Sequence, residues 1–240
     1  MAGKRAIVWG ATGGVGDALV AALVKTGHYD VVHAGSRAGR ATGGGIVRPF
    51  AFDLLDEASI GAATGRIGED GPVHLSIVAT GVLQTDRHKP EKSFAALSQE
   101  AMLDLFRINT IGPALIAKHS VALMPRDERS VFAALSARVG SITDNRLGGW
   151  HSYRASKAAL NMIIANLGIE LQRTRPQAIA VGLHPGTVDT TLSRPFQKNV
   201  PLAKLQSPAQ SAAHLVAVMD GLTRADSGHV IAWDGERIPG

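Results

Sequence analysis

The chain lacks cysteine altogether, and it has few aromatic residues and no long uninterrupted apolar run. Without thiols it can form no disulfide framework, no thiolate nucleophile and no zinc–thiolate site. A membrane-spanning helix needs about 18 to 20 consecutive apolar residues, so we expect no membrane association. The nine histidines are scattered, with no spacing like that of a zinc-binding H-E-x-x-H helix. The sequence therefore predicts no metal site.

The basic residues also form no cluster along the chain. The formal net charge is +5, but the 25 basic residues are dispersed and aromatic residues make up only 5% of the chain. Nucleic-acid binding usually needs clustered basic residues with aromatics for stacking. We therefore expect no nucleic-acid partner, and a small phosphorylated anion fits the charge better. The N-terminus shows no secretory signal pattern, which predicts a cytoplasmic protein.

Short apolar runs alternate with longer helical patterns along the whole chain. Such alternation predicts parallel β-α-β units in one doubly wound α/β sheet with helices on both faces. No linker or repeat divides the chain, so residues 1–240 are expected to form a single domain. The predicted strands are residues 6–9, 31–34, 47–52, 75–79, 131–135, 178–183 and 229–233. The predicted helices are residues 15–26, 98–124, 153–173 and 208–222, the second bent near Gly112 and Pro113.

A glycine-rich turn follows the first predicted strand. It reads Gly10-Ala11-Thr12-Gly13-Gly14-Val15-Gly16 and leads into the first predicted helix. Glycines permit a tight turn and let backbone N–H groups approach a pyrophosphate at a helix N-terminus. A lone glycine pattern is also common in ordinary loops. Its position after the first strand of an alternating chain favours dinucleotide binding.

The end of the second strand indicates which dinucleotide binds. An acidic residue there would favour the free 2′-hydroxyl of NAD. The chain instead reads Gly35-Ser36-Arg37, with Arg40 close behind and no acid before Asp53. A guanidinium can pair with a 2′-phosphate, although a solvated surface arginine would look the same. We predict NADP(H).

Tyr153 and Lys157 lie four residues apart on a predicted helix. Residues at this spacing share one helix face, so both side chains can face one cavity. A nearby ammonium group is expected to lower the pKa of a phenol, which would suit a proton donor to a carbonyl oxygen. The same spacing also occurs on solvated helix faces.

In their order along the chain, these motifs resemble the short-chain dehydrogenase/reductase family of single-domain Rossmann-type proteins. Asp53-Leu54 is similar to the family's adenine-contacting pair, and Asn109 matches its central-helix asparagine. Pro185-Gly186 with Thr190 resembles the segment that closes over the nicotinamide. The C-terminal end, from Ser227 to Gly235, resembles the subgroup of C-factor-like and sniffer-like carbonyl reductases.

The resemblance implies a catalytic set and reversible hydride transfer between NADPH and a small carbonyl or alcohol substrate. Tyr153 would donate the proton, Lys157 would support it and bind the nicotinamide ribose, Ser136 would orient the carbonyl, and Asn109 would hold a water. It also implies cofactor contacts at Gly10, Thr12, Gly13, Gly14, Val15, Gly16, Ser36, Arg37, Asp53, Leu54, Ala79, Gly81, Tyr153, Lys157, Pro185, Gly186, Val188 and Thr190.

The chain departs from the family pattern in four places. Trp9 replaces the usual threonine before the glycine turn, and Val78-Ala79-Thr80-Gly81 replaces N-N-A-G. Ala137 follows Ser136 where many relatives have a second serine. The segment between this point and Tyr153 is also long. Ser136 and Ser141 therefore both remain candidates for the catalytic serine.

Other readings of the sequence stay open. The same fold could serve a non-catalytic NADP(H)-binding regulator, or an isomerase with tightly held nicotinamide. Substrate identity cannot be read, but Trp150, Leu192, Phe196 and Leu202 predict a partly apolar pocket. Family members commonly pair through their two long central helices, so the resemblance implies a homodimer or homotetramer.

Overall fold

A computed structural model of the chain describes residues 3–201 and 204–240. An eight-stranded sheet forms its centre, with the strand order β10-β9-β6-β5-β4-β1-β2-β3. The strands are β1 (Arg5–Trp9), β2 (Val31–Ser36), β3 (Val47–Ala51), β4 (Leu75–Val78), β5 (Ser130–Leu135), β6 (Ala178–His184), β9 (Val230–Ala232) and β10 (Arg237–Ile238). All neighbours pair in parallel except β10, which pairs antiparallel with β9. The sequence did not predict this last strand.

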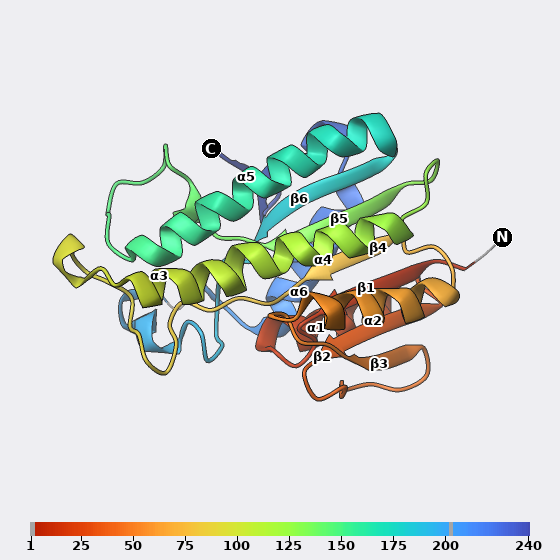
Figure 1. Cartoon of the computed structure of the whole chain (residues 1–240), viewed down its shortest axis with the longest axis horizontal. Helices are drawn as coiled ribbons and strands as arrows, with labels where there is room; N and C mark the ends of the chain where they lie inside the picture. The colour runs from red at the N-terminus through yellow and green to blue at the C-terminus, as the bar shows by residue number, and fades with distance from the viewer. Residues whose placement is uncertain (1–2, 202–203) are drawn as a thin grey trace.

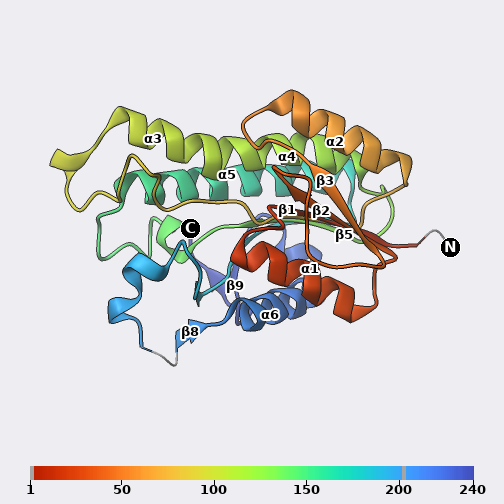
Figure 2. The same ribbon diagram turned by 90° about the horizontal axis from the view of Figure 1, so that it is seen from below.

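Helices cover both faces of the sheet, giving three layers (Figures 1 and 2). Helices α2, α4 and α5 pack on one face, and α1 and α6 on the other. The described helices are α1 (Gly14–Thr26), α2 (Glu57–Glu69), α3 (Gln99–Phe106), α4 (Gly112–Ser120), α5 (His151–Thr174) and α6 (Pro208–Gly221). The predicted doubly wound α/β architecture is confirmed.

Alternate residues of β1 enter the two cores, which explains why its run is continuously apolar. Ala6 and Val8 belong to the core beneath α1 and α6, whereas Ile7 and Trp9 belong to the core beneath α2, α4 and α5. A strand covered on both faces needs no polar alternation. The indole N–H of Trp9 donates to Ser76 Oγ at 3.1 Å, so this departure from the family pattern is a satisfied core residue.

The helical segment from 99 to 123 is interrupted where the sequence predicted only a bend. A π-helical turn, Arg107–Ile111, separates α3 from α4, and a 3₁₀ turn, Val121–Leu123, ends the segment. Pro113 has no N–H to donate four residues back, which removes an α-helical bond at the turn. The break places Asn109 in the π-helical turn, where the residue is fully buried.

Loops at one end of the sheet carry the shorter elements. Strands β7 (Thr187–Val188) and β8 (Leu205–Gln206) form a separate parallel pair. A 3₁₀ helix, Arg194–Asn199, lies between them in the chain. Ligands of open parallel sheets bind outside the carboxyl ends of the strands, and these loops lie at that end. No helix among residues 3–201 and 204–240 is long and apolar enough to span a membrane.

Candidate active site

The glycine turn between β1 and α1 is shaped for close backbone approach. Gly10 has φ +93°, and the N–H groups of Gly10 and Ala11 both donate to Gly35 O at 2.9 and 2.8 Å. A Cβ on Gly16 would lie 2.1 Å from Gly10 O, and one on Gly14 would lie 2.7 Å from Thr190 Cγ2. The first contact is with backbone, so only glycine fits at position 16, and a side chain at position 14 would displace Thr190. The turn therefore presents the first N–H groups of α1 without intervening side chains, as a pyrophosphate would require.

The end of β2 carries the residues predicted to select the nucleotide. Ser36 is buried and its hydroxyl bonds Arg40, donating to the carbonyl oxygen at 2.6 Å and accepting from the N–H at 3.0 Å. This bond closes a tight turn that leaves Arg37 exposed. Arg37 forms no ion pair within the described chain. Its guanidinium is thus available to an added anion.

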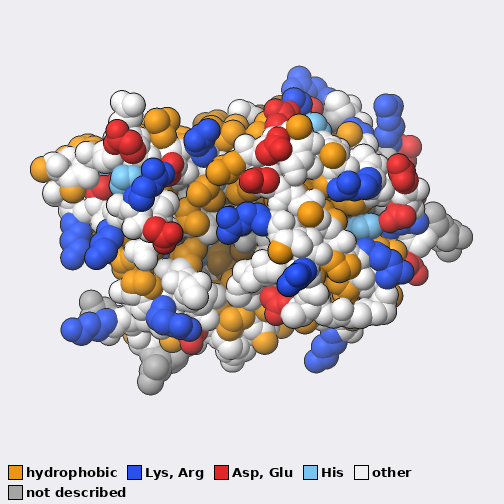
Figure 3. All heavy atoms as spheres, turned by 60° about the horizontal axis from the view of Figure 1, so that its bottom comes forward, with side chains coloured by type: hydrophobic (Ala, Val, Ile, Leu, Met, Phe, Trp, Pro, Cys, Tyr) orange, Lys and Arg blue, Asp and Glu red, His pale blue; other side chains and the backbone are white. Residues whose placement is uncertain are grey.

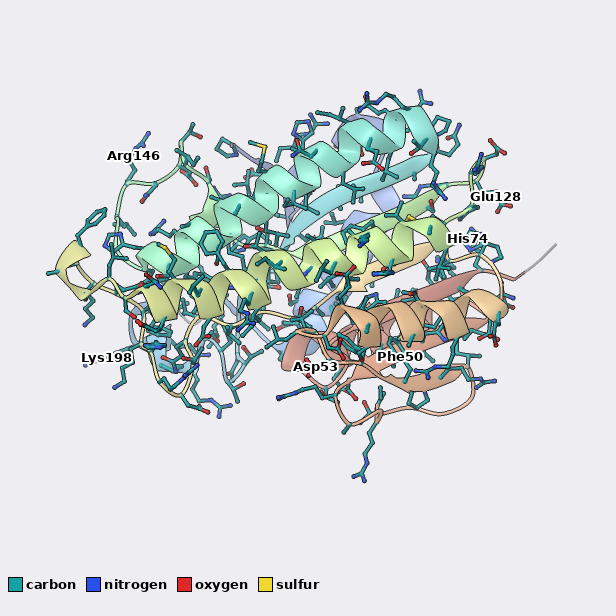
Figure 4. The ribbon with its side chains drawn as sticks, viewed as in Figure 1. Phe50, Asp53, His74, Glu128, Arg146 and Lys198 are labelled. Atoms are coloured by element: carbon teal, nitrogen blue, oxygen red, sulfur yellow. The ribbon has the colours of Figure 1, made fainter. Side chains whose placement is uncertain are left out.

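Asp53 and Leu54 follow β3 at the same end of the sheet as this turn. The Asp53 carboxylate accepts from Leu55 N at 2.9 Å, and the Asp53 N–H donates to Ser59 Oγ at 3.0 Å. Leu54 packs so closely on α4 that a Cβ on Gly112 would lie 2.6 Å from its Cδ1. Figure 4 shows Asp53 on the segment between β3 and α2. No described contact joins this pair to the cavity below.

Tyr153 and Lys157 lie on the first turns of α5, and both side chains are buried. Lys157 Nζ lies 5.9 Å from the centroid of the Tyr153 ring and donates to Leu135 O, at the end of β5, at 2.8 Å. Burial raises the pKa of Tyr153 to about 12 and lowers the pKa of Lys157 to about 8, because each charged form is desolvated. The expectation that Lys157 lowers the pKa of Tyr153 is wrong for this structure, since burial of the phenol dominates.

Asn109 ties the π-helical turn to the segment after β4. Its Oδ1 accepts from Val82 N at 2.9 Å, and its Nδ2 donates to Val82 O at 2.8 Å and to Ser156 Oγ at 3.1 Å. A Cβ built on Gly81 would lie 3.4 Å from both Asn109 Oδ1 and Lys157 Nζ. Asn109 and the ammonium group therefore both lie close to Gly81, and Asn109 fixes the backbone of the following residue.

The two serine candidates lie in different places. Ser136 borders the cavity, is nearly fully buried, and donates from Oγ to Asn161 Oδ1 of α5 at 2.6 Å. Ser141 accepts from Asp144 N and bonds Gly240 O, and it is not among the residues that line the cavity. Location thus favours Ser136 over Ser141. Ala137 also borders the cavity and packs in the same small apolar cluster as Tyr153.

One cavity of about 350 Å³ joins the glycine turn to the tyrosine and lysine. Figure 3 shows a hollow with hydrophobic side chains in its wall. Twelve of the predicted site residues border this cavity: Gly13, Gly14, Val15, Ala79, Gly81, Ser136, Tyr153, Lys157, Pro185, Gly186, Val188 and Thr190. The other predicted site residues do not border it: Gly10, Thr12, Gly16, Ser36, Arg37, Asp53, Leu54 and Asn109.

Trp150 and Phe196 form an aromatic part of the cavity wall. Their ring centroids are 5.1 Å apart, and Trp150 lies edge-on to Tyr153 at 6.4 Å. Leu192 also borders the cavity, whereas Leu202 lies outside the described residues. The predicted partly apolar wall is thus present. Leu83, Thr191, Ser193 and Val200 also line the cavity, and they lie in the irregular segments 83–94 and 190–207 that the sequence marks as substrate-bordering loops. Sequence reasoning did not select the remaining lining residues, because nothing in their local pattern marks them: Thr80, Leu135, Val139 and Thr187.

His184 adds a neutral polar group at the end of β6. It borders the cavity, and its Nδ1 is buried with no hydrogen-bond partner in the described chain. Burial lowers the pKa of His184 to about 4, and the Arg138 guanidinium acts in the same direction. The imidazole is therefore uncharged at neutral pH. Among the described residues no group of three or more His, Asp and Glu side chains is arranged to hold a metal ion.

A Rossmann-type sheet with a glycine cradle and a buried Tyr–Lys pair in one cavity defines a protein of the dinucleotide-binding α/β class. Residues 4–201 match the sequence profile of the family described as short chain dehydrogenase. The chain belongs to this family of oxidoreductases.

Relatives with similar sequences agree with this assignment. The 1-hydroxy-2-glutathionyl-2-methyl-3-butene dehydrogenase of Rhodococcus sp. strain AD45 is 32% identical over 193 residues, spanning 80% of this chain and 79% of its own. The C-signal protein of Myxococcus xanthus is 32% identical over 139 residues, spanning 58% of this chain and 78% of its own.

Solved structures share the fold over nearly the whole chain. The NADPH-bound carbonyl reductase from chicken fatty liver has a TM-score of 0.84 at 22% identity, covering 98% of this chain and 94% of the other. The Drosophila melanogaster carbonyl reductase Sniffer has a TM-score of 0.84 at 21% identity, covering 100% of both chains. The predicted likeness to the C-factor-like and sniffer-like subgroup is confirmed.

The buried lysine predicts a pH dependence of stability. Its pKa is lower in the folded chain, about 8, than the ordinary 10.5, so the unfolded chain binds more protons between these values. Stability therefore rises with pH across that window. Relative to Lys157→Met, the wild type should gain roughly 3 kcal/mol of unfolding free energy as the pH rises from 8 to 10.5.

Urea denaturation of both proteins at several pH values measures this difference. Tyr153, whose pKa is raised, contributes with the opposite sign above pH 10. That contribution is common to both proteins and cancels in the comparison. A difference that stays constant with pH would show that Lys157 titrates at its ordinary value.

Proposed function

We propose that the chain is an NADP(H)-dependent reductase that converts a small carbonyl compound to an alcohol, or the reverse, by hydride transfer. The observation that carries the proposal is the shared cavity: the glycine turn, the Tyr–Lys pair and segment 185–190 all border one space. Bound NADPH would supply the hydride there. Two of the similar solved structures hold NADPH or NADP, which supports this cofactor.

Tyr153 is the proposed proton donor. Because burial raises its pKa to about 12, the phenol keeps its proton throughout the neutral range. An alkoxide is more basic than a phenolate, so transfer from Tyr153 to the developing alkoxide oxygen is downhill. At neutral pH Tyr153 is therefore in the protonated form that carbonyl reduction requires.

Lys157 is proposed to hold the site together and to supply positive charge. Below about pH 8 it is an ammonium group beneath the reacting region, bonded to Leu135 O and close to the Tyr153 ring. Its remaining protons are free to bond a ribose hydroxyl of the cofactor. Asn109 is proposed to support it by fixing Val82, which follows Gly81 next to the ammonium, and its predicted bound water stays a prediction.

Ser136 is the serine proposed to orient the carbonyl oxygen. It borders the cavity, and its hydroxyl is held by Asn161 one helical turn beyond Lys157. A hydroxyl group can donate only one proton. Ser136 must therefore give up its hydrogen bond to Asn161 in order to donate to the carbonyl oxygen of the substrate. Ala137 and the Trp150–Phe196 wall leave an apolar surface for the rest of the substrate.

The helix-packed oligomer stays a prediction. Leu160 and Ile164 of α5 are buried against the sheet, which accounts for part of the apolar sequence there. Met162 and Ile169 on the same helix are more than half exposed. A second copy of the chain covering this face is proposed as the homodimer contact.

Replacing Tyr153 tests the proton donor. Tyr153→Phe keeps the ring and removes the hydroxyl, so we expect kcat for NADPH-dependent carbonyl reduction to fall by about 10² or more. NADPH affinity, followed by cofactor fluorescence, should change little. Tyr29→Phe alters the chain's other tyrosine, which packs against the core under α1 and α6, and should leave kcat unchanged. Retained turnover in Tyr153→Phe would contradict the assignment.

Replacing Arg37 tests the cofactor. Loss of a hydrogen bond to a charged group costs about 1.5 to 3 kcal/mol, so Arg37→Ala should weaken NADPH binding by about tenfold or more while leaving NADH binding unchanged. Fluorescence titration with both nucleotides measures the preference. Arg66→Ala, an exposed arginine near the end of α2, makes the same charge change elsewhere. A wild type that prefers NADH would refute the NADP(H) assignment.

A further inference from the structure

Glu91 is a buried carboxylate in the loop that precedes the 3₁₀ turn Phe94–Ala96. Glu91 is only 5% exposed to solvent. It is the one buried acidic residue in the described chain. It makes no ion pair with Lys, Arg or His within the described residues. A buried carboxylate without a cation is costly unless hydrogen bonds satisfy it. Its partners therefore matter.

Within residues 3–201 and 204–240, all the hydrogen bonds to Glu91 come from the start of α5. One carboxylate oxygen accepts from Ser152 N at 3.3 Å, and the other accepts from Ser152 Oγ. The backbone oxygen of Glu91 accepts from Trp150 N at 2.5 Å. Helix α5 begins at His151, and Trp150, its N-cap residue, provides no side-chain cap. Glu91 supplies that missing cap from a segment about 60 residues earlier in the chain.

The same contact holds Trp150 in an unusual conformation. Trp150 has φ +50°, the one positive value at a non-glycine residue in the described chain. This left-handed geometry costs a bulky residue free energy and persists only where surrounding contacts fix it. It directs the indole to the cavity, beside Phe196 and Tyr153. A second contact joins the two segments, because the rings of Phe94 and His151 pack in a tilted arrangement with centroids 4.4 Å apart.

We propose that Glu91 is a positioning residue that clamps the loop 83–94 to the first turn of α5 and thereby sets the placement of Tyr153 and Trp150. The inference rests on the proposed reductase function, since Tyr153 and Trp150 border the cavity assigned to it. Tyr153 directly follows Ser152, so a shift of the helix start displaces the phenol hydroxyl. A misplacement of about 1 Å can cost about 10² in rate.

Three variants test the clamp. Glu91→Ala removes every side-chain bond, and we expect kcat to fall by about tenfold or more while the dissociation constant of NADPH stays within about twofold. Glu91→Gln keeps an acceptor oxygen and should restore kcat to within about threefold of wild type. Ser152→Ala removes only the hydroxyl donor and should lower kcat by about threefold, which decides the question if Glu91→Ala does not fold.

The control is Asp226→Ala. The Asp226 carboxylate also accepts from the N–H and hydroxyl of a single residue, Thr223, but it pairs with Arg237 as well, and none of the three residues borders the cavity. This variant should lower the melting temperature and leave kcat unchanged. If Asp226→Ala lost as much kcat as Glu91→Ala, Glu91 would only stabilise the start of α5, and the positioning role would be refuted. Wild-type kcat in Glu91→Ala would overturn the proposal.

Amide hydrogen exchange separates this proposal from the function on which it rests. Glu91→Ala should exchange faster than wild type across residues 148–157, and Asp226→Ala should not. A wild type without NADPH-dependent turnover would refute the proposed function, yet faster exchange at 148–157 would still support the clamp. Unchanged exchange in Glu91→Ala would refute the clamp, whatever the turnover.

Discussion

The hydrogen bond from Lys157 Nζ to Leu135 O is the contact on which the rest of the site depends. It joins α5 to the carboxyl end of β5, and both residues line the cavity. Because the ammonium lies in a low-dielectric environment, it needs such a partner to remain charged near neutral pH. Asn109 then fixes the neighbouring backbone, and Tyr153 lies one turn earlier on the same helix face. The ammonium thus joins α5 to β5, and Asn109 joins the π-helical turn to the segment after β4 and to Ser156 of α5.

Burial acts on the Tyr–Lys pair in opposite directions and for one reason. Desolvation penalises whichever form is charged, so it raises the pKa of Tyr153 and lowers the pKa of Lys157. The phenol becomes a donor that keeps its proton, while the ammonium approaches the neutral range in which its charge can be lost. Such opposite pKa shifts are typical of active sites in which the local environment determines which group acts as acid and which as base.

Much of the architecture could be predicted from local patterns, because strands covered on both faces are continuous apolar runs. Helix α2 could not be predicted in this way, because Gly61, Gly65 and Gly68 interrupt its apolar periodicity and are poor helix formers. Gly61 lies against His119 and Gly68 against Leu123, so at least two of these glycines serve helix packing. The site shows the same limit. The four-residue spacing reveals that Tyr153 and Lys157 share one helix face. In the sequence Glu91 looks like any acidic loop residue, and only its contact with Ser152, 61 residues later in the chain, shows its role.

The transfer of deuterium from cofactor to product tests the central claim most directly. The purified protein is incubated with NADPH deuterated at the transferable C4 position and a panel of small aldehydes and ketones, and the products are examined by mass spectrometry. The account predicts an alcohol carrying one deuterium on the former carbonyl carbon. Unlabelled products, or NADPH that binds in the cavity and is never consumed with any carbonyl compound, would contradict a hydride-transfer site and favour a nucleotide-binding role without catalysis.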